Sequence, residues 1–232
     1  MILRSRVPEL MDDPTLDDER HFEALKGLEK INSISNGALF VWKSLHLHAS
    51  EQSGGTLRVL DIATGGGDTP ISLALLAERS GLSMQIDGCD FSERAVNYAA
   101  EKAENAGTRN RFFILDALKD ELPQSYDVIT CSLFMHHLDP EQVIVLLKKM
   151  AQAAQQKILV NDLLRSSFNL MLVTLASRLL CSSQVVHHDG PVSVRAAYTM
   201  EEMDQMATAA GLDNYHISSR FPCRYLLDWS RR

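Results

Sequence analysis

The sequence predicts an α/β fold, in which helices cover both faces of a mostly parallel sheet. From residue 57 onward, short apolar runs of β type alternate with longer helical patterns. This alternation is typical of parallel strands joined by helical crossovers. The last two runs are joined only by Phe221-Pro222-Cys223. A link this short joins antiparallel neighbours, so we expect the final pair of strands to be antiparallel.

The expected strands are apolar runs bounded by polar or turn-forming residues. They cover residues 57–61, 84–90, 111–116, 126–133, 157–162, 215–220 and 224–229. Runs of this length suit strands better than helices, which need roughly ten residues or more.

Helices are expected between the strands, where capping residues open a helical pattern and glycines close it. One begins near Thr69, a candidate N-cap, and ends at Gly81, while the next ends at Gly107. Asp139-Pro140-Glu141-Gln142 and Thr199-Met200-Glu201-Glu202 have the spacing of capping boxes. Each of these two segments predicts the start of a further helix.

The most apolar stretch, residues 163–181, predicts a helix buried against protein. Arg165, Asn169 and Arg178 interrupt it, and such residues are costly in hydrocarbon, so no membrane span is expected. Its role stays open between a lid over an apolar acceptor pocket and plain core packing. We expect His187 and its neighbours to form a loop within a helical insertion at about 163–198.

The chain is predicted to divide into a helical cover or lid over residues 1–55 and a larger domain over residues 56–232. Apolar residues recur at helical spacing through residues 22–31 and 38–47, but so short a segment is near the lower limit for independent folding. No apolar secretory run opens the sequence. We therefore expect a cytoplasmic protein.

The composition is that of an ordinary globular protein, and it limits the partners. Apolar residues make up 45% of the chain and the formal net charge is −7, the wrong sign for a protein that binds nucleic acid through its phosphates. The four cysteines match neither a zinc site nor a disulfide framework in their spacing. We expect a small-molecule partner and no nucleic acid, while the oligomeric state stays open, a homodimer included.

A glycine-rich turn, Asp61-Ile62-Ala63-Thr64-Gly65-Gly66-Gly67-Asp68, joins the first strand to the first helix. Glycines allow a close approach of the backbone to a ligand, and the helix N-terminus presents free N–H groups. The turn therefore predicts a nucleotide ligand, although a tight connection alone could also require glycine. Asp90 and Asp116 close the next two strands. Parallel strands end at the sheet edge where ligands bind, so we expect these acids beside the turn.

A nicotinamide cofactor is the first candidate for this turn, but its fingerprint needs a third glycine. Gly65 and Gly67 are followed by Asp68-Thr69-Pro70, so that glycine is missing. Asp61 would also repel a pyrophosphate, whereas it would attract a ligand with cationic groups. An NAD-type oxidoreductase stays as an alternative function, and so does a non-catalytic binding module on the same fold.

Several segments together resemble the class I S-adenosylmethionine-dependent methyltransferases. Residues 59–67 are similar to the first motif of that family, with Ala63 where the first glycine is usual. Asp90-Phe91-Ser92 resembles the second motif and Asp116-Ala117 the third. Residues 127–138, with their His-His-Leu continuation, resemble the fourth strand and the segment that follows it.

The resemblance implies a doubly wound, Rossmann-like sheet of seven strands in the order 3-2-1-4-5-7-6, with the last strand antiparallel. It also implies S-adenosylmethionine as the cofactor and S-adenosylhomocysteine as the product, with Asp90 on the ribose and Asp116 on the adenine amino group. The residues that it places around the cofactor are Asp61, Ala63, Thr64, Gly65, Gly67, Asp68, Asp90, Phe91, Asp116, Ala117, Ser132, Leu133 and His137.

The implied reaction is methyl transfer to the oxygen or carbon of a small acceptor, which a looser similarity suggests is a lipophilic aromatic or polyketide-like molecule. The sulfonium is already activated, so the protein mainly holds the acceptor in line in a water-poor site. A base for the acceptor is predicted among His136, His137 and His187, although each could instead be a structural or loop residue. No metal is expected, because adjacent side chains such as His187 and His188 usually point apart.

Overall fold

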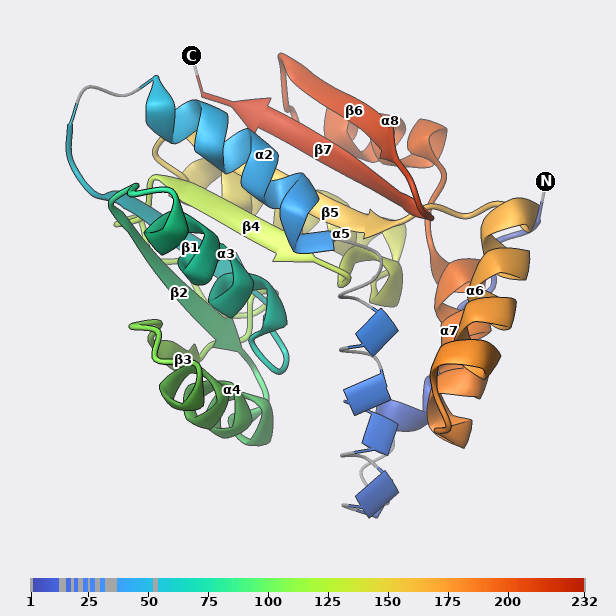
Figure 1. The fold of residues 1–232 in the computed structure, drawn as a ribbon. Coiled ribbons are helices and arrows are strands. Elements are labelled where there is room, and N and C mark those ends of the chain that lie inside the picture. Colours follow the sequence, from blue (N-terminus) through green and yellow to red (C-terminus); the bar gives the residue numbers. More distant parts are fainter. Residues whose placement is uncertain are drawn as a thin grey trace.

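A computed structural model describes residues 2–12, 16–17, 19–20, 23–24, 26–27, 30–31, 37–51 and 54–231. Its centre is a sheet in the order β3-β2-β1-β4-β5-β7-β6 (Figure 1). The strands are β1 (Leu57–Ile62), β2 (Met84–Asp90), β3 (Phe112–Ile114), β4 (Val128–Ser132), β5 (Lys157–Leu163), β6 (Tyr215–Arg220) and β7 (Arg224–Ser230). This order confirms the seven-stranded, doubly wound sheet expected from the sequence.

The strands from β1 to β5 run parallel, and β7 runs antiparallel to both of its neighbours. Leu163 at the end of β5 lies opposite Arg224 at the start of β7. An antiparallel strand begins where its parallel neighbour ends, so β7 contributes its first residues to the edge at which the parallel strands finish. β3 is shorter than expected, and Asp116 lies beyond its end.

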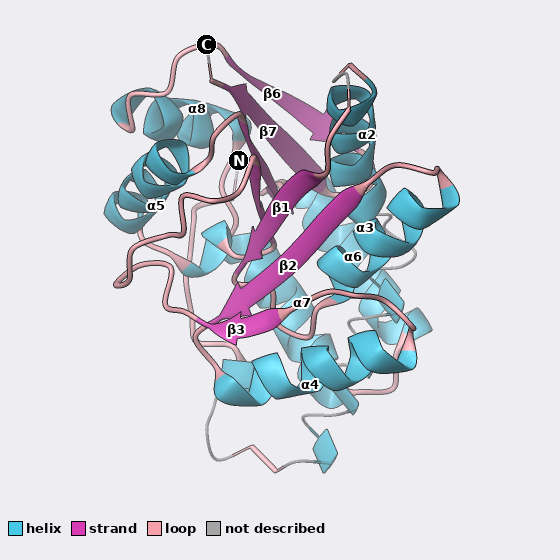
Figure 2. Cartoon of the chain, turned by 90° about the vertical axis from the view of Figure 1, so that its left-hand side faces the viewer, coloured by secondary structure: helices cyan, strands magenta, loops and turns pink. Residues whose placement is uncertain are grey.

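Helices cover both faces of the sheet (Figures 1 and 2). Their bounds are α2 (Gly37–Ser50), α3 (Asp68–Arg79), α4 (Glu93–Asn105), α5 (Pro140–Ala153), α6 (Ser167–Leu180), α7 (Gln184–Ala196) and α8 (Met200–Ala209), with 3-10 turns η1 (Leu10–Asp12) and η2 (Met135–His137). One apolar cluster joins α2 and α3 to the sheet, and another joins α5 and α8 to the opposite face. The two layers of helices leave the ends of the central strands available for a site.

Local capping explains where several helices begin. Both expected capping boxes are present, with Asp139 at the start of α5 and Thr199 at the start of α8. Ser92 caps α4 by accepting a hydrogen bond from the backbone N–H of Ala95. The expected cap at Thr69 is wrong, because α3 begins at Asp68 and its N-cap is Gly67, two residues before Thr69, in a left-handed conformation with φ 77°.

The segment after α6 is a helix, so the expected loop around His187 is wrong. Residues 189–191, Asp-Gly-Pro, favour a turn, and Pro191 has no N–H to offer inside α7. Burial outweighs that loss, because Val185, Val186 and Val194 are turned inward. α7 packs against α6 at Gly190, where a Cβ would lie 3.0 Å from a methyl carbon of Val173.

α6 itself is less buried than its composition suggests. Its buried residues are Asn169 and Ser177, because small and polar side chains form the close contact with α7. The large apolar residues that remain exposed on it are Phe168, Met171, Leu175 and Leu179. Plain core packing is therefore the wrong interpretation of this helix. Among the helices of the described residues, none is long and apolar enough to cross a membrane.

The N-terminal segment ties the insertion to the sheet. The guanidinium of Arg4 donates hydrogen bonds to the carbonyls of Ala196 at 2.7 Å and Leu138 at 2.8 Å. The backbone N–H groups of Leu10 and Met11 donate to the buried carboxylate of Asp189 at 2.8 and 3.0 Å. Much of the predicted helical pattern over residues 22–31 lies outside the described residues.

Candidate functional site

The glycine turn between β1 and α3 is built on left-handed backbone. Ala63, Gly65 and Gly67 have φ values of 51°, 53° and 77°, a region that favours glycine. At Gly67 there is also no room for a side chain, since a Cβ would lie 2.9 Å from the Cβ of Ala99. The turn is therefore fixed by geometry at Gly67 and carries strain at Ala63.

Asp61 lies under the turn, in β1, with 1% of its surface exposed. Its carboxyl group accepts hydrogen bonds from the hydroxyls of Thr130 at 2.6 Å and Thr64 at 2.8 Å. Burial raises the pKa of Asp61 to about 7, against the lowering effect of these two bonds. A nearby cation would therefore favour ionisation of this carboxyl group.

Asp90 at the end of β2 holds the turn from the side. One oxygen accepts a hydrogen bond from the backbone N–H of Gly65 at 2.9 Å, and the other accepts from that of Ser92 at 3.0 Å. Phe91, the next residue, is 69% exposed. The end of β2 thus places a carboxylate against the glycine turn, and the next residue carries an exposed aromatic ring.

Asp116 and Ala117 follow β3 at the same edge. The carboxylate of Asp116 pairs with Lys119 at 2.9 Å and accepts hydrogen bonds from the backbone N–H groups of Leu118 and Lys119. The hydrogen bond from Lys119 is the main reason that the pKa of Asp116 is lowered. Ala117 is buried in the core, so its side chain contributes packing.

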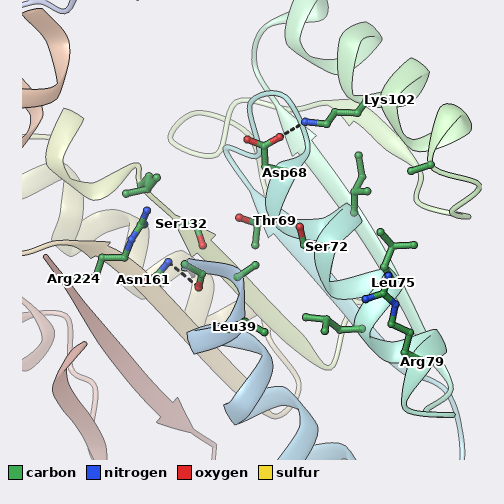
Figure 3. A pocket seen from close by; sticks show the side chains of 16 residues that line it. Leu39, Asp68, Thr69, Ser72, Leu75, Arg79, Lys102, Ser132, Asn161 and Arg224 are labelled. Carbon is green, nitrogen blue, oxygen red and sulfur yellow. Dashed lines mark hydrogen bonds and ion pairs between the residues drawn. The ribbon is translucent and has the colours of Figure 1, made fainter. Parts of the chain in front are cut away.

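A cavity of about 490 Å³ lies between α2, α3 and the ends of β4 and β5 (Figure 3). Three expected cofactor residues, Asp68, Ser132 and Leu133, line it. Asp68 forms an ion pair with Lys102 of α4. Much of the remaining wall is apolar, with side chains from Ala38, Leu39, Ile71, Leu75, Leu76 and Ala106. Its lining includes residues of α2 and none of α6 or α7 among the described residues.

One end of the cavity is polar in a way that the sequence did not reveal. Arg224 is only 3% exposed, and burial lowers the pKa of its guanidinium to about 10. The Oγ of Ser132 and the Oδ1 of Asn161 are buried without a hydrogen-bond partner among the described residues. All three residues line the cavity. The sequence predicted that Arg224 begins an antiparallel strand, but only the structure shows that this strand starts beside the end of β5.

The candidate histidines separate into two groups. His187 lies on α7, where its Nε2 is 2.8 Å from the carbonyl oxygen of Cys181. His136 and His137 lie together in η2, just after β4, with ring centroids 4.2 Å apart. The structure thus brings the η2 pair to the ligand edge and keeps His187 in contact with its own insertion.

The η2 histidines have different electrostatic environments. The Nδ1 of His136 is 2.7 Å from the carboxylate of Asp162, at the end of β5. Burial lowers the pKa of His136, but the charge of Asp162 and this hydrogen bond outweigh it and leave the pKa raised. Burial and the neighbouring His136 lower the pKa of His137 to about 3.

Known proteins are similar to this chain in sequence and in fold. Residues 59–157 match the model of a family described as a methyltransferase domain. A ubiquinone biosynthesis O-methyltransferase of Burkholderia ambifaria is 30% identical over 122 residues, which cover 52% of this chain and 46% of that protein. The chain thus spans about half the length of the curated relatives that it matches.

Solved structures resemble the whole fold at low sequence identity. The S-adenosylmethionine-dependent methyltransferase SibL in its apo form has a TM-score of 0.68 at 18% identity, over 98% of this chain and 63% of that one. The plantazolicin methyltransferase BpumL in complex with SAH has a TM-score of 0.66 at 17% identity, over 95% of this chain and 92% of that one. Residues 59–157, which hold the glycine turn and its flanking acids, thus match a methyltransferase domain, and the sheet order and these solved structures support the class I S-adenosylmethionine-dependent methyltransferase fold for the chain.

Proposed function

We propose that this protein transfers a methyl group from S-adenosylmethionine to a small lipophilic acceptor and releases S-adenosylhomocysteine. The observation that carries the proposal is the contact between the glycine turn and Asp90, in which the Gly65 N–H donates to the carboxylate at 2.9 Å. This contact lies at the edge where the parallel strands end, and the turn leads directly into the cavity wall at Asp68. A nucleoside and its sulfonium arm fit such an edge.

Each acid has a separate part in holding the cofactor. Asp90 retains lone pairs that can accept hydrogen bonds from ribose hydroxyls, and Asp116 lies beyond β3 for the adenine amino group. Phe91 is exposed beside Asp90 and offers an apolar face to the adenine. Asp61, beneath the turn, favours a cationic ligand because a positive charge stabilises its ionised form.

The cavity supports an acceptor with an apolar body and an oxygen-bearing end. Leu39, Leu75 and Ile71 offer apolar surface along it, while Arg224 and Ser132 offer polar groups at the end nearest β4. An aromatic or polyketide-like molecule has this combination, and its hydroxyl oxygen or an activated carbon would receive the methyl group. A site of this kind also excludes water, which favours in-line transfer from the sulfonium.

Assistance to the acceptor comes from η2 in this proposal. His136 and His137 lie in η2, four and five residues after β4 ends at Ser132. Ser132 and Leu133 line the cavity, whereas the two histidines lie outside its lining. His187 is set aside because its Nε2 contacts the carbonyl of Cys181. Asp162 fixes the ring of His136 and acts as a positioning residue.

Calorimetric titration with S-adenosylhomocysteine tests the proposal directly. We expect saturable binding by the unmodified protein and binding weakened about tenfold, or ~1.4 kcal/mol, in Asp90→Asn, because a charged acceptor for the ribose hydroxyls is lost. Glu101→Gln, which removes an exposed charge on α4, is the matched control and should bind normally. Binding of NAD with no response to S-adenosylhomocysteine would overturn the proposal, while normal cofactor binding without methyl transfer to phenols, quinones or acids would indicate a binding module.

A further inference from the structure

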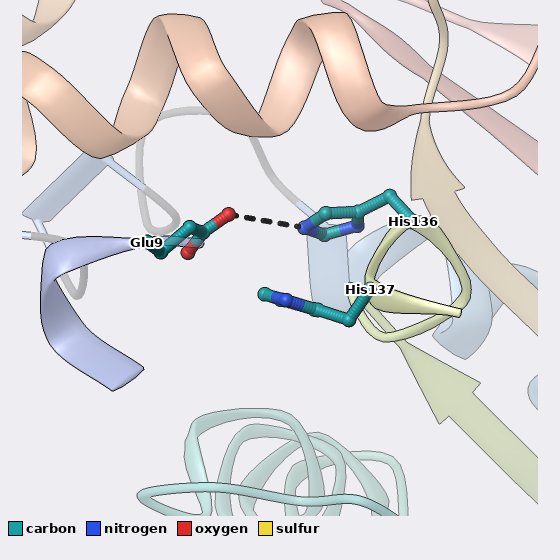
Figure 4. Close-up of side chains that lie close together, drawn as sticks. All are labelled: Glu9, His136 and His137. Atoms are coloured by element: carbon teal, nitrogen blue, oxygen red, sulfur yellow. Dashed lines mark ion pairs between the residues drawn. The ribbon is translucent and has the colours of Figure 1, made fainter. Parts of the chain in front are cut away.

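Glu9, His136 and His137 form a cluster at η2, and none of them is among the residues that line the cavity. One ligand atom from each lies within 4.8 Å of the others. The carboxylate of Glu9 is 3.9 Å from the Nε2 of His136 (Figure 4). The cluster brings the N-terminal segment to the connection after β4, although these residues are far apart in sequence.

The ring of His136 is oriented as the ring of a metal-bound histidine is. Its Nδ1 faces the carboxylate of Asp162 at 2.7 Å, and Asp162 also accepts a hydrogen bond from the backbone N–H of His136 at 3.1 Å. A carboxylate on one ring nitrogen fixes the tautomer and leaves the other nitrogen as the ligand atom. In this protein that second nitrogen, Nε2, is the one that faces Glu9.

His137 completes a donor set of two imidazoles and one carboxylate. Its ring lies over that of His136, tilted by 34°, so these adjacent side chains share a direction instead of pointing apart. The general expectation that adjacent side chains point apart therefore does not hold for the η2 pair. Two histidines and one glutamate are the three protein ligands of a well-known class of catalytic zinc site, which keeps a position open for water or substrate.

The spacing of the cluster is close to what an ion requires. Ligand atoms about 2.1 Å from a tetrahedral ion lie about 3.4 Å from one another, so the three groups need only a small inward movement. The backbone on both sides of the cluster is held, since Arg6 donates a hydrogen bond to the carbonyl of His137 at 2.7 Å. Glu9 is followed by Leu10, whose N–H is bound by Asp189. The scaffold is therefore largely preformed.

We propose that Glu9, His136 and His137 bind one divalent transition-metal ion of the Zn²⁺ type, with Asp162 as the outer carboxylate that orients His136. Neutral imidazoles with a single carboxylate suit Zn²⁺, Co²⁺ or Ni²⁺ better than Mg²⁺ or Ca²⁺, which prefer oxygen ligands. With the ion bound, neither imidazole would be available as a base, and a water molecule on the ion would have a lowered pKa. The binding of the ion itself is independent of the proposed methyl transfer.

Titration of the chelator-treated protein with Co²⁺ tests the site without any activity assay. We expect one equivalent to bind and to give the visible absorption of Co²⁺ held by three protein ligands. Zn²⁺ added afterwards should displace it and abolish the absorption. Mg²⁺ in the same experiment should cause no change.

Variants separate a built site from surface binding. Glu9→Gln and His137→Gln should each weaken Zn²⁺ binding at least about tenfold, and Asp162→Asn should do so by roughly 10–100-fold. His216→Gln, which replaces an exposed histidine on β6, is the matched control and should bind normally. His136→Gln removes a buried partner of Asp162, so circular dichroism must first show that it folds.

Three results would overturn the proposal. The first is the absence of Co²⁺ absorption at saturating metal in the unmodified protein. The second is equal affinity in Glu9→Gln, His137→Gln and the unmodified protein. The third is an equal loss in His216→Gln, because adventitious binding by scattered histidines would then account for the titration.

Discussion

Ala63 shows how a single residue can meet the geometry of a glycine-rich turn at an energetic cost. It adopts φ 51° in the position where the family resemblance leads one to expect glycine. An alanine in the left-handed region is disfavoured by roughly 1–2 kcal/mol. The hydrogen bonds around it hold it there, including the one from the Thr64 N–H to the Cys89 carbonyl at 3.0 Å.

The variant Ala63→Gly should therefore be at least as stable as the unmodified protein. Relief of the left-handed strain outweighs the extra freedom that glycine gives the unfolded chain, so we expect a gain of up to about 1 kcal/mol. Urea denaturation measures this free energy of unfolding. The control is Ala100→Gly on the exposed side of α4, which should lose about 1 kcal/mol. Equal losses in the two variants would contradict the assignment of strain to Ala63.

Asp61 makes the stability of the protein depend on pH. Its folded pKa of about 7 lies above the ordinary value of 3.8, so the folded state binds a proton that the unfolded state has already released. Its contribution to stability is full below pH 3.8 and is lost as pH rises through about 7.

In Asp61→Asn this dependence should disappear. Between about pH 5 and pH 8 the unfolding free energy of the unmodified protein should fall by about 2–3 kcal/mol relative to the variant. Urea denaturation at several pH values measures the difference. The asparagine can still meet Thr130 and Thr64 because hydroxyls both donate and accept. If the unfolding free energies of the two proteins changed with pH in the same way, the pKa of Asp61 would not be raised in the folded state.

Among the elements, α7 differs most from what its sequence suggests. Pro191 and Gly190 favour a turn locally, yet α7 continues through both residues. Val185 and Val186 of α7 form an apolar cluster with Ala24, and Met11 of the N-terminal segment packs against this cluster. The burial of these valines thus outweighs the local preference for a turn. This burial could not be predicted from the sequence, because it depends on a distant segment that covers the helix.

The N-terminal segment depends on one carboxylate of α7. Asp189 accepts hydrogen bonds from two backbone N–H groups, those of Leu10 and Met11. Asp189→Ala would leave both without this partner, and we expect a loss of about 2–4 kcal/mol, the scale of hydrogen bonds to a buried charged group.

Hydrogen exchange distinguishes this effect from general destabilisation. In Asp189→Ala the amides of Leu10 and Met11 should exchange faster, while those of β4 stay protected. Glu104→Gln on α4 removes an exposed charge and serves as the control. Unchanged exchange at Leu10 and Met11 in the alanine variant would contradict a role for Asp189 in holding the segment.

At the scale of the whole molecule, the sheet and its glycine turn could be predicted because their signals are local. Alternating patterns, capping boxes and the short link before β7 each act over a few residues. The roles of Arg224 and Glu9 could not be predicted in this way. Arg224 reaches the cavity because β7 runs backwards beside β5, and Glu9 meets His136 only after the N-terminal segment has crossed to η2.

The hydrogen bonds made by Arg4 also have a consequence for the order in which the protein folds during synthesis. They join residues separated by 192 positions at Ala196 and 134 at Leu138, and contacts so distant in sequence form late, because a long loop must close first. The glycine turn and its acids draw on residues 57–116, which leave the ribosome well before the partners of Arg4. In a nascent chain, the glycine turn and its flanking acids should therefore assemble before Arg4 makes its hydrogen bonds.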